Sequence, residues 1–224
     1  MKEINELINL DEPGWPLVQE WISEATNLVE VLPNDAAQAE AALYQTQVTT
    51  RSPMGAIIHS TGGILVDNGW LRILGSGSAK LNRSLPAWNL GKSFEQPGDA
   101  PSFLLVADDA IGGFWAINGG EFGEDTGNLY YLAPDTLEWE ETELSYSEFL
   151  TFCFNGDLDE FYEGFRWKGW EKDVSGLDGN EVFSFYPFLW TNEGKNIDKL
   201  ERKKVPVQEA YQLAQEQRDT FEEE

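Results

Sequence analysis

The chain has 224 residues, of which 40 are acidic and 15 are basic, so its formal net charge at pH 7 is −25. Apolar residues make up 41% of it and include 9 Trp, 13 Phe and 7 Tyr, a composition that excludes a disordered chain and predicts a folded core. An acidic surface repels nucleic-acid phosphates and anionic lipids, so we expect no nucleic acid and no membrane as a direct partner. It attracts basic proteins, although acidic side chains also serve solubility alone.

The cysteine content and the start of the chain bear on its compartment. The one cysteine, Cys153, excludes an internal disulfide and suits a reducing environment. Residues 1–7 carry acidic side chains where a signal peptide would be basic. No apolar run approaches the roughly 18 residues that would suggest a membrane span. We therefore expect a cytoplasmic protein.

Helices are expected in the first 48 residues. A short one could cover residues 3–9, and apolar residues then recur at helical spacing over residues 17–29. Asn34 or Asp35 can cap a further, alanine-rich helix that runs to about Val48.

Residues 53–141 are predicted to form an antiparallel β-meander. Residues 56–74 alternate short β-rich runs with Gly-Gly and Asn-Gly, which are hairpin turn signals. Residues 75–100, rich in Gly, Ser, Pro and Asn, indicate a long loop, and residues 118–127 form an acidic glycine loop. Strands are expected at 103–107, 113–117, 128–133 and 137–141.

Helical spacing returns after the meander. Ser145 and Glu148 form a capping box for a helix that ends at Asn155-Gly156, and Asp157 with Glu160 repeats the pattern for a second short helix. Residues 182–190 indicate a strand entering an aromatic loop, and Pro206 can start a last helix.

These patterns predict an α+β fold, in which an antiparallel β-meander is packed by N-terminal and C-terminal helices. We expect one domain over residues 1–224. Its parts are a helical start (1–48), the meander (53–141) and a helical, aromatic C-terminal part (145–224).

The residue types that common catalytic centres need are missing, so we expect no catalytic residue, no metal and no cofactor. His59 is the single histidine and lies in an apolar run, and Cys153 lies on an apolar helix face, so a zinc site of the usual Cys/His kind is excluded by count. Gly91-Lys92-Ser93 ends like a phosphate loop, but Pro86 occupies the earlier glycine position. Residues 75–78 lack the third glycine of a dinucleotide-binding loop, and no Gly-x-Ser-x-Gly follows a strand.

Carboxylates are the groups from which a site could still be built. Asp108 and Asp109 could meet Glu121, Glu124 and Asp125 across the next hairpin, and paired carboxylates can bind Ca²⁺ or Mg²⁺ or hydrolyse a glycoside. The loop lacks the spacing of a calcium-binding loop, so a solvated turn is the simpler interpretation.

Aromatic residues beside glycine and charge supply candidate binding surfaces. Trp70 with Arg72, Trp115, and the pair Trp167 and Trp170 lie in or near turns, and Trp and Arg dominate the energetics of many interfaces. Packing at the edge of the core is the alternative for each, but we expect at least one Trp on the surface. The candidate binding residues are Trp70, Arg72, Asp108, Asp109, Trp115, Asn118 and Glu121.

Five segments carry a resemblance to an uncharacterised bacterial family that is known only as a domain of unknown function. They are DEPGWPLVQEWI (11–22), TTRSPMGAIIHSTGGILVDNGWLRILGSG (49–77), LLVADDAIGGFWAINGG (104–120), GNLYYLAPDTLEWEETELSYSEFLTFCFNGDL (127–158) and YPFLWTNEG (186–194). The resemblance covers nearly the whole chain and implies no known activity.

A more distant resemblance is to the SUKH superfamily, which includes bacterial immunity proteins and yeast cell-wall regulators. A hydrophobic strand, Gly-Gly and a second strand (104–117), a Gly-x-Leu-Tyr strand (127–131) and a Ser-x-x-Glu-Phe-Leu helix (145–150) follow in the order typical of that group. The chain departs from the group by continuing well past this helix, with an aromatic segment at 166–190. The resemblance implies a SUKH-like fold and binding to a protein, without enzyme activity.

We therefore expect a non-catalytic, acidic protein-binding module, in one form an immunity-type inhibitor of a basic toxin. The alternative is a small-ligand-binding protein or hydrolase that uses the carboxylates of the hairpin at 108–125. Mimicry of nucleic acid by the acidic surface is a third hypothesis.

Overall fold

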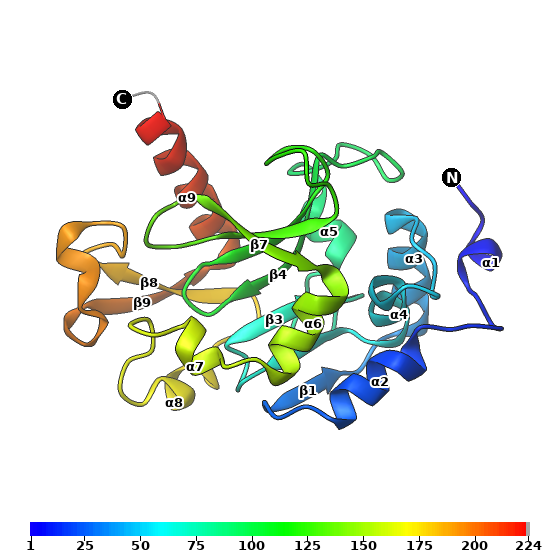
Figure 1. Cartoon of the computed structure of the whole chain (residues 1–224), viewed down its shortest axis with the longest axis horizontal. Coiled ribbons are helices and arrows are strands. Elements are labelled where there is room, and N and C mark those ends of the chain that lie inside the picture. The colour runs from blue at the N-terminus through cyan, green and yellow to red at the C-terminus, as the bar shows by residue number, and fades with distance from the viewer. Residues whose placement is uncertain (223–224) are drawn as a thin grey trace.

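A seven-stranded antiparallel sheet forms the centre of the molecule (Figure 1). The computed structural model describes residues 1–222. The strands are β1 (Val29–Leu32), β2 (Gly63–Val66), β3 (Leu71–Leu74), β4 (Phe103–Asp109), β5 (Phe114–Asn118), β6 (Asn128–Leu132) and β7 (Trp139–Ser145). Each pairs with the next in chain order, so the predicted meander and the α+β class are confirmed.

Helices from the first half of the chain gather at one end of the sheet (Figure 1). They are α1 (Ile4–Leu7), α2 (Trp15–Ser23), α3 (Ala36–Thr46), α4 (Pro53–Ser60) and α5 (Leu85–Asn89). The predicted cap of α3 is confirmed, because the Asp35 side chain accepts a hydrogen bond from the Gln38 amide. Helix α5 lies inside the segment that the sequence predicted as one long loop.

Two expectations for this half were wrong. The helix predicted over residues 17–29 ends at Ser23, because Asn27 is tied to the far end of another helix: its side chain donates to the Cys153 and Gly156 carbonyls. The chain then turns into β1. Residues 56–60, predicted as part of a β-rich run, belong to α4, whose first turn has Ser52 as its cap and Pro53 at its start.

Most of the C-terminal part lies at the other end of the sheet, whereas its first helix, α6 (Tyr146–Asn155), lies beside α2 (Figure 1). This part comprises α6, α7 (Leu158–Phe161), α8 (Trp170–Val174), β8 (Glu181–Tyr186), two short 3₁₀ turns (Asn192–Lys195 and Ile197–Lys199), β9 (Glu201–Pro206) and α9 (Val207–Glu222). The capping box at Ser145 and Glu148 is confirmed, and α9 begins directly after Pro206 as predicted. Strand β9, which the sequence did not predict, pairs with β8 in a separate two-stranded sheet.

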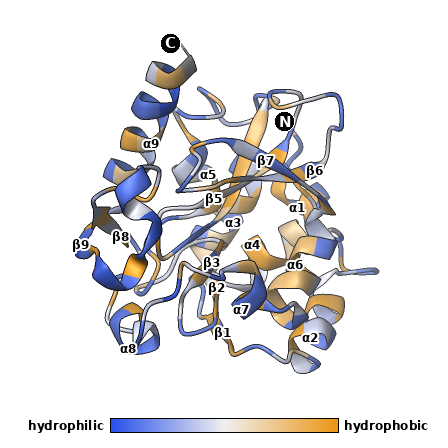
Figure 2. Cartoon of the chain, turned by 60° about the vertical axis from the view of Figure 1, so that its left-hand side comes forward, coloured by the Kyte–Doolittle hydropathy of each residue, from blue (hydrophilic) through white to orange (hydrophobic). Residues whose placement is uncertain are grey.

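The core is continuous from the N-terminal helices to α9. Strands β2 to β6 contribute apolar side chains that no solvent reaches, and Figure 2 shows hydrophobic ribbon concentrated in the interior strands and in the helices beside them. Helix α9 alternates hydrophobic and hydrophilic turns in the same view, which is typical of a helix with one buried side.

Candidate functional site

Three of the four tryptophans predicted as surface anchors are buried. Trp70 and Trp115 are both 0% exposed, and Trp167 is 1% exposed. Trp70 packs edge-on against Tyr162 and Trp170, with ring centroids 5.2 and 5.0 Å away. Trp170 is half-buried, so among the tryptophans of these turns it alone is partly exposed, and none of the nine is largely exposed. Each ring fills the space between the sheet and the C-terminal part.

Arg72 and Asp108 form the centre of a buried charge network. The Asp108 carboxylate contacts the Arg72 guanidinium at 2.5 Å and the Arg83 guanidinium at 2.6 Å. Arg72 also donates to the main-chain carbonyl of Glu181, the first residue of β8, and Arg83 donates to that of Gly179, just before β8. Burial lowers the pKa of Arg72, and the Asp108 charge beside it opposes that shift. These groups therefore hold the C-terminal part on the meander and offer little surface to a partner.

Asp109 organises the turn between β4 and β5. Its carboxylate accepts hydrogen bonds from the amides of Ile111 and Gly113 and from the hydroxyls of Tyr131 (2.6 Å) and Tyr162 (3.2 Å). Burial raises the pKa of Asp109, while these donors lower it. All of its lone pairs point at donors of the same chain, so the side chain is structural.

The predicted carboxylate cluster is not formed. Asp108 pairs with Phe114 at one end of the β4–β5 hairpin, and Phe103 pairs with Asn118 at the other. Phe103 and Asp108 are five residue steps apart along β4, a span of about 17 Å. Glu121 therefore lies far from Asp108 and Asp109, and the hairpin carboxylates do not converge.

Asn118 and Glu121 belong instead to the acidic glycine loop at 118–127. Asn118 is 1% exposed, and its side chain holds the loop by accepting from the Gly120 and Phe122 amides and donating to the Gly123 carbonyl and to Asp125. Glu121 is exposed at the tip of this loop. Burial and a hydrogen bond to Asp125 raise the pKa of Tyr130, at the base of the loop, to about 12.

An apolar cavity of about 240 Å³, here named the α9 cleft, lies against α9. Its walls are β8 and β9, one side of α9, the aromatic segment 188–190, and the turns at 111–112 and 134–137. Ser184 and Val205 lie on one face of the β8–β9 pair, since Val182 pairs with Val205 and Ser184 with Lys203. The cleft thus lies where three parts of the chain that are distant in sequence meet.

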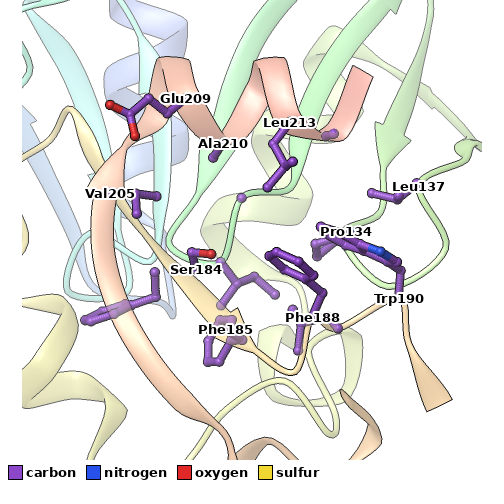
Figure 3. A pocket seen from close by; sticks show the side chains of 15 residues that line it. Pro134, Leu137, Ser184, Phe185, Phe188, Trp190, Val205, Glu209, Ala210 and Leu213 are labelled. Atoms are coloured by element: carbon purple, nitrogen blue, oxygen red, sulfur yellow. The ribbon is translucent and has the colours of Figure 1, made fainter. Parts of the chain in front are cut away.

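The two ends of the α9 cleft differ in chemistry. Figure 3 shows Glu209 and Val205 at one end, and Phe188, Trp190 and Pro134 at the other. The rings of Phe188 and Trp190 are stacked, with centroids 4.3 Å apart and planes 7° apart. Glu209 is the only charged residue in the lining, and among the described side chains no hydrogen bond or ion pair engages its carboxylate. One end is therefore aromatic and the other acidic.

A second hollow, the loop groove, adjoins the cleft on the other side of α9. It has a volume of about 620 Å³ and lies between the acidic loop, β7 and the second half of α9. Phe122 and Trp139 stack along it with centroids 4.4 Å apart, and its charged residues are Glu121, Glu138 and Arg218. Leu137 lines both hollows, so the two adjoin each other beneath α9.

Helix α9 is placed between the hollows by its periodicity. Residues four apart share one side of a helix, so Glu209 and Leu213 face the cleft while Tyr211 and Gln215 face the groove. Tyr211 anchors the helix by packing edge-on against Phe114 of β5, with centroids 4.9 Å apart. Burial raises the pKa of the Tyr211 hydroxyl to about 12.

Sequence reasoning did not find most of the residues that line these hollows. It placed an aromatic loop after β8, and this loop supplies Phe188 and Trp190, but it gave them no binding role. The sequence around Glu209 does not mark it as a binding residue. In a chain with many acidic residues, a single one can be recognised as a candidate only when its neighbours in space are known. Glu121 is the one predicted binding residue that lines a hollow near α9.

Within residues 1–222, no three His, Cys, Asp or Glu side chains lie together in a way that could hold a metal ion. No helix in the same range is both long enough and apolar enough to cross a membrane.

Comparison with known proteins gives three matches that cover nearly the whole chain. The profile of a family described as a protein of unknown function, DUF2625, matches residues 4–210. The uncharacterized protein YbfG of Escherichia coli strain K12 is 46% identical over 221 residues, which cover 99% of this chain and 99% of that protein. An uncharacterized protein of Haemophilus influenzae strain Rd is 43% identical over 221 residues, or 99% of this chain and 97% of its own. The names of these relatives carry no activity.

Proposed function

The chain belongs to the DUF2625 family, and we propose that it is a non-catalytic protein-binding module whose α9 cleft and loop groove receive a segment of a basic partner. The observation that carries this proposal is the pair of adjoining hollows, which combine stacked aromatic rings with carboxylates. Aromatic rings in concave sites supply large contact area at low entropic cost, and such residues often dominate binding energy.

Charge supports a basic partner over an acidic one. The hollows contain three carboxylates, those of Glu209, Glu121 and Glu138, and one guanidinium, that of Arg218. The whole chain adds a field of net charge −25, which speeds the approach of a cationic surface and repels an anionic one.

The finer form of the proposal is an immunity-type inhibitor that acts in the cytoplasm on a basic toxin. Its support is the resemblance of segments 104–117, 127–131 and 145–150 to the SUKH superfamily, together with the acidic charge. The carboxylates of Asp108, Asp109 and Glu121 do not converge, so no observation favours the alternative of a hydrolase at that hairpin.

Selection of displayed peptides on the purified chain tests the proposal. We expect enriched peptides to combine aromatic or aliphatic residues with Lys or Arg, and to bind more weakly as ionic strength rises. Leu213→Lys places a cation in the cleft and Glu138→Lys places one in the groove, so each should weaken binding of the selected peptides.

Gln212→Lys is the matched control for Leu213→Lys, because Gln212 is exposed on the opposite side of α9 and adds the same charge outside both hollows. Glu216→Lys, also exposed and outside both hollows, reverses a charge as Glu138→Lys does and is its matched control. Equal weakening by the controls and by the two hollow variants would mean that only overall charge matters. Enrichment of acidic peptides, or of none, would refute the proposal.

A further inference from the structure

We infer that the α9 cleft binds two side chains of one partner segment. One is large and apolar, best an aromatic ring, and the other is cationic and lies two residues away along that segment. The inference rests on the proposed function and deepens it, since it names the chemistry and the orientation of the bound segment. The aromatic side chain occupies the end at Phe188 and Trp190, and the cation lies at Glu209.

The aromatic end has the size and the surface for a ring. A cavity of about 150 Å³ lined by apolar side chains is enough to hold benzene, and the α9 cleft measures about 240 Å³. Trp190 and Phe188 are half-buried, so part of this stacked pair remains open to a further ring. A third ring stacked or set edge-on against them would gain contact beyond simple burial.

The acidic end favours a cation for two reasons. The Glu209 carboxylate lies on the first turn of α9 at the rim, and its side chain is exposed and has no partner among the described residues (Figure 3). The cleft lining contains no basic residue that could neutralise it. The nearest basic side chain on the same face of β9 is Lys203, which pairs with Ser184 and lies outside the lining.

The spacing of two is the shortest one that places both side chains on the same side of an extended segment. Strands β8 and β9 form the floor of the cleft, and a segment lying extended along it points every second side chain to the same side. The partner residue between the aromatic and the cationic one faces away from the cleft and can be small.

Three peptides test the inference: Ac-Trp-Gly-Lys-NH₂, Ac-Trp-Gly-Gln-NH₂ and Ac-Trp-Gly-Glu-NH₂. Binding is measured by ligand-observed NMR titration at low and at physiological ionic strength. We expect the lysine peptide to bind about fivefold more tightly than the glutamine peptide, which is the upper range for an exposed ion pair, and the glutamate peptide to bind most weakly. Glu209→Gln should remove the preference for lysine and leave the affinity of the glutamine peptide unchanged. Trp190→Ala should weaken all three.

Glu216→Gln is the control variant, because Glu216 is exposed on α9 outside both hollows and the change in net charge is identical. Equal effects of Glu209→Gln and Glu216→Gln, or the same affinity for all three peptides, would overturn the inference, as would a lack of binding by any of them. Basic display-selected peptides that lose affinity with Glu138→Lys but not with Glu209→Gln would keep the proposed function and overturn this inference alone.

Discussion

Replacing Asp108 with Asn should unfold the chain at a much lower denaturant concentration. The side chain is 0% exposed and pairs with two guanidiniums whose side chains are only 2% (Arg72) and 9% (Arg83) exposed. Removing one partner from a buried ion pair costs about 3–5 kcal/mol, because the remaining charge stays buried without compensation. An Asn carbonyl can still accept from one arginine and retain about 1 kcal/mol. We therefore expect a loss of about 2–4 kcal/mol.

Equilibrium unfolding in urea, followed by tryptophan fluorescence and far-ultraviolet circular dichroism, measures this loss. For a chain of this size it corresponds to a melting temperature lower by about 4–16 °C. Glu12→Gln is the control: Glu12 and Arg51 form an ion pair at 2.8 Å but are 66% and 67% exposed, so its loss should leave the midpoint nearly unchanged. A cost below about 1 kcal/mol for Asp108→Asn would refute the view that this network holds the two parts together.

Three further changes probe other parts of the fold. Gly113→Ala should destabilise the chain by about 1–3 kcal/mol or more in urea unfolding, because a Cβ there would lie 2.2 Å from the Tyr131 hydroxyl. Burial raises the pKa of the Cys153 thiol well above its usual value, so a thiol reagent at mildly alkaline pH should label it only after denaturation, as mass spectrometry would show. The Ser145 hydroxyl lowers the pKa of Glu148, so the carboxylate stabilises the fold above its ordinary pKa and loses this effect as the pH falls through the lowered value. The difference in unfolding midpoint between the wild type and Glu148→Gln should accordingly shrink from neutral to acid pH, and a difference that grew would contradict the assignment.

The sequence predicted those elements whose signals are local. The capping box of Ser145 and Glu148 and the cap at Asp35 satisfy amides three residues away, so their effect does not depend on the rest of the fold. The Asn-Gly turn between β2 and β3 is local in the same sense, since Asn68 and Gly69 both adopt positive φ.

Elements set by distant contacts were missed. Residues 28–29 continue an apolar helical pattern, but the contacts of Asn27 with α6 keep them out of that helix, and Val29 begins β1 instead. Strand β9 contains Glu201-Arg202-Lys203-Lys204, which shows no apolar alternation because it forms the outer edge of a two-stranded sheet.

The candidate site was harder to predict than the fold. Trp70 and Trp115 beside glycines have the composition of an interface, but composition does not tell whether a ring points outward or inward. The α9 cleft depends on three segments, near residues 112, 188 and 209, that only the complete tertiary structure brings together.

The buried arginines also impose an order of events during synthesis. Arg72 donates to the carbonyl of Glu181, which lies 109 residues later in the chain. At about 5–20 residues per second, that carbonyl leaves the ribosome roughly 5–20 s after the arginine does. During this interval the guanidiniums of Arg72 and Arg83 lack the carbonyl acceptors that the region of β8 supplies later. This part of the meander therefore stays in contact with water. The sheet can close over its charged centre only after about four fifths of the polypeptide have been made, and a nascent chain that stalls before β8 should remain a substrate for chaperones.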